Sequence, residues 1–249
     1  MSNLNNLQEW FATPLGQYLL TQEQRHHDRV VADIFGFHAV QLGMPQIDLL
    51  QTNRIPHKFH LDFQGNADVI ANYNELPLDT QSIDLLVLPH ILEFSENPHQ
   101  ILREVDRVMM PEGRVIITAF NPWSLWGMRR WLRADADQYP WCGNFISLVR
   151  MKDWLSLLGF DVASGKLACY VPPVTQEKWL SRFNFMEDAG DRWWAIGGGI
   201  YIIEAIKHVH GMRVITPAWS DTEKRFSAAP RVVGLRRSSV RASNLRVVK

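Results

Sequence analysis

The chain has 249 residues, 46% of them hydrophobic and 21% charged, and its formal net charge at pH 7 is zero. A chain of this length and apolar content can bury a full core, so we expect one large domain. The balanced charge gives no electrostatic reason to expect nucleic acid or a membrane surface as the partner. No window approaches the roughly 18 apolar residues that a membrane span requires, and the N-terminus lacks the pattern of an export signal. We therefore expect a cytoplasmic protein, which also suits the two widely spaced cysteines.

Helices followed by three short strands are predicted for the first part of the chain. Residues 7–35 carry two apolar stripes at helical spacing, and we expect residues 1–35 to form a helical cap over a sheet. His38–Gly43 is a short candidate strand that ends at a glycine. Lys58–Phe63 and Asp68–Ala71 are the next two candidate strands.

A strand, a helix and a second strand are predicted in the centre of the chain. Ile83–Leu88 is an apolar run of strand length, which is typical of a parallel strand covered on both faces. Asn97 is the candidate N-cap of an amphipathic helix that begins at Pro98. We expect a turn at Pro111–Gly113 and an apolar, β-branched strand at Val115–Phe120. This order predicts a right-handed parallel crossover in an α/β domain.

The remaining elements are a helix, two strands and a tryptophan-rich insertion. Val149–Leu158 is predicted to be a helix that leads into a strand from Phe160 to about Tyr170, and Ile200–Lys207 is predicted to be the final strand. The chain contains 10 tryptophans, several of which fall in an insertion around residues 121–145 and 171–198. These rings either form an apolar lid that contacts a substrate or a protein partner, or pack in the core.

The last segment is basic. From Lys224 to Lys249 every charged residue is Lys or Arg, and no helical stripe persists. We expect residues 216–249 to form a disordered tail. Contact of this tail with nucleic acid or an acidic partner is the less favoured alternative, because no row of aromatic residues accompanies the charges.

Five short motifs follow one another in a fixed order in the middle of the chain. They are Glu75-Leu76-Pro77, Ser82-Ile83-Asp84, His90-Ile91-Leu92, Leu102-Arg103-Glu104 and Pro111-Glu112-Gly113. This series resembles the later half of the class I S-adenosylmethionine-dependent methyltransferases. The resemblance implies a Rossmann-like α/β fold over about residues 36–215, with a seven-stranded, mostly parallel sheet of order 3-2-1-4-5-7-6. It also implies an antiparallel last strand, helices on both faces, and a ligand over the carboxyl ends of the first strands.

The resemblance implies S-adenosylmethionine as the cofactor, held partly by a glycine-rich loop after the first strand. The family normally has an acid followed by Gly-x-Gly there, because glycine permits a close approach of the backbone. This chain has Gln41, Gly43 and Pro45 instead, so the motif is degenerate: an amide replaces the acid, and proline removes an N–H. Gln41 and Gly43 remain candidate cofactor contacts, and we expect the affinity for the cofactor to be reduced.

Further candidate cofactor contacts are Asp62, Asn72, Tyr73 and Pro89. Asp62 is expected at the end of the second strand, where it accepts from ribose hydroxyls, unless it is a surface residue of a loop. Asn72 offers an amide oxygen to the adenine amino group where the family has an acid, with Tyr73 beside it. His90 is either the catalytic general base or a side chain that fixes the loop after its strand.

Asn121 and Trp123 are candidate substrate contacts, with a packed insertion as the alternative. The histidines, cysteines and carboxylates show no recognised metal spacing, so we expect no metal. The favoured function is S-adenosylmethionine-dependent methyl transfer to a small-molecule substrate. The alternative, which Gln41 and Pro45 favour, is a catalytically inactive methyltransferase-fold protein that acts as a binding or regulatory module.

Overall fold

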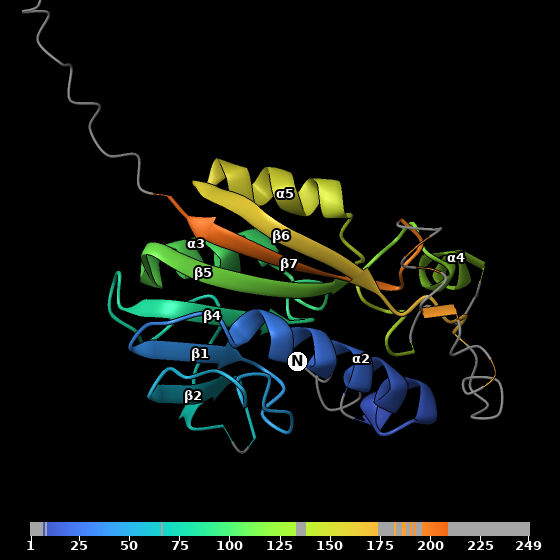
Figure 1. The fold of residues 1–249 in the computed structure, drawn as a ribbon, viewed down its shortest axis with the longest axis horizontal. Helices are drawn as coiled ribbons and strands as arrows, with labels where there is room; N and C mark the ends of the chain where they lie inside the picture. The colour runs from blue at the N-terminus through green and yellow to red at the C-terminus, as the bar shows by residue number, and fades with distance from the viewer. Residues whose placement is uncertain are drawn as a thin grey trace, which may run out of the picture. The chain divides into compact units, whose positions relative to one another are not determined.

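The computed structural model describes residue 7, residues 9–65, 67–132, 138–173 and 196–208, and the positions 182, 186, 187, 190 and 192. Seven strands form one sheet in the order β3-β2-β1-β4-β5-β7-β6 (Figure 1). The strands are β1 (His38–Leu42), β2 (His57–Asp62), β3 (Val69–Ile70), β4 (Ile83–Pro89), β5 (Met109–Phe120), β6 (Phe160–Ala168) and β7 (Ile200–Lys207). The helices of this part of the chain are α2 (Pro14–Val31), α3 (Pro98–Val108), α4 (Leu125–Leu132) and α5 (Leu148–Leu157).

The strand pairing confirms the predicted sheet. β1 pairs in parallel with β2 and β4, β2 with β3, and β4 with β5. β7 runs antiparallel to both β5 and β6, so the reversed strand is the last one, as expected. β7 also has the bounds predicted from the sequence, because its isoleucine-rich run is buried almost throughout between two neighbours.

The strand β4 and the helix α3 lie close to their predicted positions. Nearly every residue of β4 is buried, as a continuous apolar run in a parallel sheet requires. α3 begins at Pro98, where the missing N–H costs nothing. Asn97 occupies the N-cap position, but its side chain makes no capping hydrogen bond. The helix is therefore held in place mainly by its apolar face, which is buried against the sheet.

Residues 111–113 do not form the separate turn that the sequence predicted. β5 begins at Met109 and runs through them, and its register against β4 shifts after the pair Ile83–Met109. Glu112 has a φ of 62° in this irregular stretch. A bulge accommodates proline and glycine within a strand because it releases them from regular pairing. The turn-forming residues therefore distort the start of a strand instead of separating two elements.

Helices cover both faces of the sheet, as predicted. α3 and α5 pack on one face. On the other face, the C-terminal end of α2 packs together with the connection between β1 and β2 (Figure 1). All residues of this connection, 43–56, are described, and they form turns and no helix. α2 and the connection 43–56 thus jointly supply the apolar cover beside β1.

A separate aromatic cluster lies at the carboxyl end of β5. It contains Phe120, Trp126 and Trp141, and the ring of Phe120 stacks on that of Trp126 with a centroid distance of 5.9 Å. Core packing therefore accounts for these two tryptophans, whereas Trp123 and Trp131 are exposed. Much of the insertion predicted around residues 171–198 lies outside the described residues.

The predicted boundaries at residues 35 and 215 stay predictions. The basic tail, 216–249, lies outside the part of the chain that the structure describes. No helix among the described residues is long and apolar enough to cross a membrane.

Candidate functional site

The carboxyl ends of the first strands bring Gly43, Asp62 and Tyr73 together. Gly43 follows β1, and its N–H donates to the carbonyl of Leu61 on β2 at 2.7 Å. Its φ of +70° lies in the left-handed region, which glycine adopts without steric cost. A Cβ atom at this position would lie 3.1 Å from the hydroxyl oxygen of Tyr73. Gly43 therefore permits a close approach, and the group that approaches it here is the Tyr73 hydroxyl.

Gln41 shapes the loop that follows β1. Its Nε2 donates to the carbonyl oxygens of Gly43 and Met44, both at 3.1 Å, and of Ile47 at 2.7 Å. Its Oε1 accepts from the N–H of Leu49 at 2.9 Å. The side chain is completely buried, so the amide is fully engaged with its own loop. Contact between Gln41 and a cofactor stays a prediction.

Asp62 is the last residue of β2 and is buried. This is the strand-end position that the sequence predicted, not the surface loop of the alternative. Its Oδ1 accepts from the N–H of Phe63 at 2.6 Å and from the hydroxyl of Tyr73. Burial and the neighbouring carboxylate raise the pKa of Tyr73 above its usual value, so this hydroxyl stays protonated and donates to Asp62.

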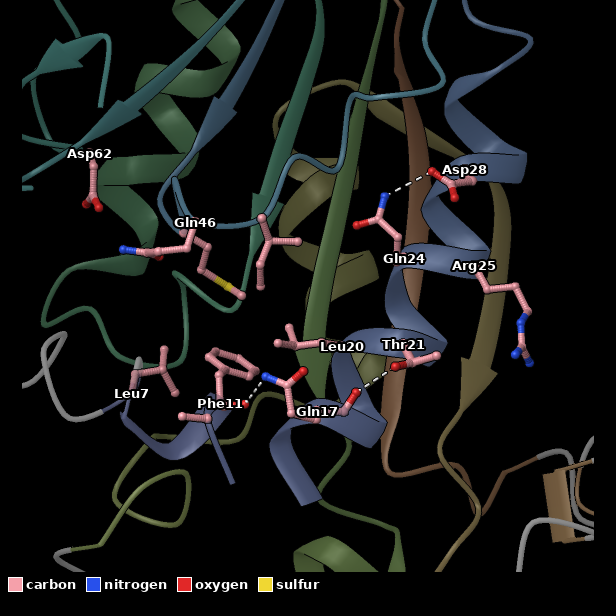
Figure 2. Close-up of a pocket in the computed structure, with 13 residues that line it drawn as sticks. Leu7, Phe11, Gln17, Leu20, Thr21, Gln24, Arg25, Asp28, Gln46 and Asp62 are labelled. Atoms are coloured by element: carbon pink, nitrogen blue, oxygen red, sulfur yellow. Dashed lines mark hydrogen bonds between the residues drawn. The ribbon is translucent and has the colours of Figure 1, made fainter. Parts of the chain in front are cut away.

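A cavity of about 760 Å³, called the large cavity below, lies between α2 and the loop after β1 and extends to Asp62 (Figure 2). It falls within the range of roughly 300–1,000 Å³ typical of ligand pockets. Figure 2 shows Asp62 and Gln46 on one side, and the α2 side chains Gln17, Thr21 and Gln24 on the opposite side. Arg25 and Asp28 add two charged groups, and the apolar part of the wall comes from Leu7, Phe11, Ala12, Leu20, Met44 and Ile47. The large cavity thus combines apolar walls with a few polar groups, as small-molecule sites do.

A cavity of about 230 Å³, called the small cavity, is lined by Asn72, Tyr73 and Asn74. The Oδ1 of Asn72 accepts from the N–H of Asn74 at 3.0 Å, so this predicted acceptor is used within its own turn. The Oδ1 of Asn74 is buried and has no hydrogen-bond partner among the described residues. Phe63 and Ile91 supply apolar walls. The small cavity therefore has apolar walls that could hold a flat ring next to an unsatisfied hydrogen-bond acceptor.

Tyr73 links the two cavities. Its ring lines the small cavity, whereas its hydroxyl is bonded to Asp62, which lines the large cavity. The structure thus brings Gly43, Asp62, Asn72 and Tyr73 into one region, as the sequence predicted.

His90 lies behind this region in a buried ionic cluster. Its Nε2 is bonded to the carboxylate of Glu23 on α2, and its Nδ1 lies 3.1 Å from Oε1 of Glu93. The same Glu93 oxygen accepts from the N–H of Phe120 at 2.5 Å. Burial alone lowers the pKa of His90, but attraction and hydrogen bonds from the two glutamates outweigh it and raise the pKa to about 10. His90 is therefore an imidazolium at neutral pH, with both ring nitrogens engaged.

A second buried histidine, His27 on α2, differs from His90 in its protonation state. Its Nε2 lies 2.8 Å from Oγ1 of Thr118 on β5. Burial, together with repulsion by His90 and His26, lowers the pKa of His27 to about 3. His27 is therefore neutral at physiological pH and packs beside the charged His90 cluster.

The other predicted site residues lie farther along the sheet edge. Pro89 is buried as the last residue of β4. Asn121 joins two loops, because its Nδ2 donates to the carbonyl oxygens of Ile196 and Gly198, both at 2.9 Å. Trp123 does not line the large or the small cavity; it lines a separate groove of about 350 Å³. Substrate contact by Asn121 and Trp123 stays a prediction.

Sequence reasoning missed the contribution of α2 and the role of Asn74. The spacing of the polar side chains of α2 that line the large cavity gave no sign of a ligand site. Glu23 was also missed, because its contact with the buried His90 joins distant parts of the chain and leaves no local pattern in the sequence. Asn74 follows Asn72 by two positions, where the Asx turn was not recognised.

Comparisons with known proteins relate the central part of this chain to one sequence family. Residues 38–117 match the sequence family described as a methyltransferase domain. The uncharacterized protein YafS of Escherichia coli (strain K12) is 30% identical over 155 residues, which cover 61% of this chain and 65% of that protein. Demethylmenaquinone methyltransferase of Chlamydia pneumoniae is 36% identical over 66 residues, or 26% of this chain and 28% of that protein. The chain thus spans less than two thirds of either relative.

A solved structure supports the same assignment at the level of the fold. A SAM-dependent methyltransferase from Thermotoga maritima superposes with a TM-score of 0.59 at 15% sequence identity, over 82% of this chain and 95% of that chain. Its likeness concerns the fold alone. Together with the strand order and the match of residues 38–117 to the methyltransferase domain, it shows that the chain has the Rossmann-like fold of the class I methyltransferases.

Among the described residues, no group of three or more histidine, cysteine or carboxylate side chains is placed to hold a metal ion. Neither Cys142 nor Cys169 forms a disulfide bond in the structure.

Proposed function

We propose that this protein transfers a methyl group from S-adenosylmethionine to a small-molecule acceptor in the large cavity. The observation that carries the proposal is the placement of Gly43 and Asp62 at adjacent strand ends beside a cavity of about 760 Å³. A ligand over the carboxyl ends of the first strands is the usual arrangement in open α/β sheets.

The residues of the two cavities fit the cofactor. Asp62 provides a buried carboxylate for ribose hydroxyls, and charge-assisted hydrogen bonds of this kind are strong. The small cavity provides apolar walls for adenine, and Asn74 provides an unpartnered acceptor for its amino group. Because Gly43 has no side chain, it leaves open the space beside the Tyr73 hydroxyl that a Cβ atom would fill.

The chain's own contribution to the reaction is positioning. Bound S-adenosylmethionine supplies an electrophilic methyl group on a sulfonium. Gln17, Thr21 and Gln24 present polar groups to the large cavity, where they orient an acceptor, and Phe11 and Leu20 keep water out. His90 is fully buried and already protonated, so it holds α2 in place and is not free to take a proton from the acceptor. A cavity of mixed polarity favours a small molecule over a macromolecule as the acceptor.

A non-catalytic binding module is the second candidate, and one observation favours it. The Tyr73 hydroxyl donates to Oδ1 of Asp62 and lies beside Gly43, so it competes with a ligand for this oxygen of the carboxylate. In an inactive protein, side chains such as Met44 or Trp123 would fill the cleft. Met44 lines the large cavity without closing it, and Trp123 lies elsewhere.

Calorimetric titration with S-adenosylmethionine and S-adenosylhomocysteine, followed by thermal unfolding, tests the proposal. Ligand at 100 times the dissociation constant adds about 2.7 kcal/mol to the free energy of unfolding, which raises the melting temperature by about 5–10 °C. Asp62→Asn should weaken binding about 10- to 100-fold, because a charged acceptor is lost. Asp153→Asn on the exposed side of α5 is the control and should leave the affinity unchanged. No heat and no shift at millimolar ligand would refute cofactor use and favour the binding module.

A further inference from the structure

Exposed apolar side chains gather around α4 at the carboxyl end of β5. Trp123 and Trp131 are 77% and 84% exposed, and Met128, Leu132 and Ile196 are also exposed. The backbone of Ile196 lies beside this segment, because its carbonyl accepts from Asn121. We call these five residues the α4 patch. Single exposed apolar residues are ordinary, but contiguous groups of large ones mark interaction surfaces.

The inner face of α4 is fixed, so the patch cannot turn inward. Trp126 is buried, and its Nε1 donates to the carbonyl of Val171 at 2.9 Å. Gly127 packs so closely on Pro122 that a Cβ would lie 2.0 Å from the Pro122 carbonyl oxygen. Trp131 and Leu132 lie three and four positions after Met128, so both are its neighbours on the surface of α4, and all three are exposed. Figure 1 shows α4 beyond the end of β5, at one end of the sheet.

The charged residues of α4 itself are basic, and Arg133, Asp135 and Asp137 follow in the sequence outside the described part of the chain. Residues 121–132 contain Arg129 and Arg130 and no acidic residue. The guanidinium groups of these arginines lie over the rings of Trp141 and Phe145, each 5.2 Å from the ring centroid, at the base of the helix. The groove that Trp123 borders contains Arg150 and His99, and its lining has no acidic side chain. The apolar side chains of the patch thus lie farther out than the two arginines of α4. This arrangement complements a surface that has a negatively charged outer layer over an apolar interior.

We propose that the α4 patch docks on the surface of an anionic phospholipid bilayer. Tryptophan, methionine and leucine enter the boundary between headgroups and acyl chains, and arginines behind them meet the phosphates. The zero net charge of the whole chain does not oppose this, because the interaction depends on the local charge at α4. This inference does not depend on the proposed methyl transfer.

The shape and size of the patch favour a bilayer over a protein. The two tryptophans project from the surface, and a fluid bilayer receives projecting rings without a preformed pocket. A stable protein interface uses about 20–30 residues on each side, whereas the α4 patch has five large apolar side chains. A second copy of this chain would therefore form only a small contact here.

Vesicle sedimentation with the full chain tests the proposal. Wild type is mixed with vesicles of phosphatidylcholine alone or with phosphatidylglycerol, and bound protein is measured in the pellet. We expect binding that requires phosphatidylglycerol and a fall in the partition coefficient of about tenfold or more in Trp123→Ser/Trp131→Ser. The matched control is Phe35→Ser/Phe37→Ser, two aromatic residues that are 69% and 72% exposed outside the patch. This control should bind like wild type.

A second readout separates insertion of α4 from attraction to the basic tail. Lipids with a nitroxide on the acyl chain should quench tryptophan fluorescence in wild type and in the phenylalanine control, but much less in the double tryptophan variant. Both variants keep the basic tail, so binding by the tail alone would be equal in the two, and a difference between them reports insertion of α4. Equal partition of the two variants, or no vesicle binding by wild type, would overturn the proposal. So would a dimer in sedimentation equilibrium without lipid that the tryptophan substitutions dissociate, which would identify a second copy as the occupant.

Discussion

Glu23 and His90 form a buried ion pair that fastens α2 to the end of β4. Both side chains have no exposed surface, and the two residues are 67 positions apart in the chain. Glu93 holds the second ring nitrogen and also the N–H of Phe120 at the end of β5. Since α2 forms one wall of the large cavity, this pair fixes the distance between that wall and the strand ends.

The two buried histidines predict a maximum of stability near pH 6.5. The pKa of His90 rises from 6.5 to about 10 on folding, so its contribution is complete below pH 6.5 and is lost as the pH rises toward 10. The pKa of His27 falls from 6.5 to about 3, so its contribution is complete above pH 6.5 and is lost as the pH falls. Each limb has a slope of at most about 1.4 kcal/mol per pH unit. Urea unfolding between pH 5 and 9.5 measures both limbs.

Glu23→Gln isolates the alkaline limb. Removing one partner of a buried ion pair should lower the free energy of unfolding by about 3 kcal/mol at pH 6.5, and this difference should shrink toward pH 9.5. Glu9→Gln changes an exposed glutamate and should have little effect at any pH. A constant difference between Glu23→Gln and wild type across this range would show that the pair does not hold the His90 proton.

The sequence predicted most of the sheet because its strands are locally distinct. β4 and β7 are apolar runs bounded by polar or turn-forming residues, and their periodicity differs from that of the helices. The start of β5 was wrong because Pro111 and Gly113 are local turn signals, whereas the actual conformation depends on register against β4. Such a shift in pairing is not visible in the composition of a single strand.

The candidate site was only partly predictable, since its walls come from distant segments. Asp62 followed from the spacing of two strands, and the structure places it at the end of β2. The contribution of α2 did not follow, because nothing in its sequence indicates which strand end it crosses. Gln41 was interpreted as a weakened cofactor contact, but its bonds organise a loop that replaces a helix, and such bonds depend on the path of residues 43–49.

Restoring the family's acid at position 41 should harm this protein. Gln41 donates to carbonyl oxygens of Gly43, Met44 and Ile47, and a carboxylate cannot donate to any of them. We expect Gln41→Glu to lower the free energy of unfolding at pH 7 by about 3 kcal/mol, because a buried charge faces unpaired acceptors. The loss should be smaller at low pH, where the protonated acid donates once. Gln138→Glu, at an exposed position, is the control; a stable Gln41→Glu variant with stronger cofactor binding would contradict this account of the loop.

Two glycines separate backbone strain from crowding. Gly43 and Gly65 both have positive φ, +70° and +101°, but a Cβ at Gly65 would meet no atom within 4 Å. Alanine at either position should cost about 1–2 kcal/mol of backbone strain. Gly43→Ala should cost at least about 1 kcal/mol more, because the new methyl group crowds Tyr73 and Ile91. Urea unfolding compares the two variants. Equal losses of unfolding free energy would show that the side chains around Gly43 move aside without an energetic cost.

The bond between Tyr73 and Asp62 predicts a variant that binds cofactor more tightly than wild type. Tyr73→Phe removes the hydroxyl that donates to Oδ1 of Asp62, so ribose hydroxyls no longer compete with Tyr73 for this oxygen. We expect the dissociation constant for S-adenosylhomocysteine to fall severalfold, while the free energy of unfolding falls by about 1.5–3 kcal/mol from loss of a charged hydrogen bond. Tyr201→Phe is the matched control, because the Tyr201 hydroxyl donates to the Ile146 carbonyl at 3.0 Å and lines neither cavity. It should lose about 1 kcal/mol of stability without a change in affinity. Weaker binding by Tyr73→Phe than by Tyr201→Phe would mean that the hydroxyl holds the ligand and does not compete with it.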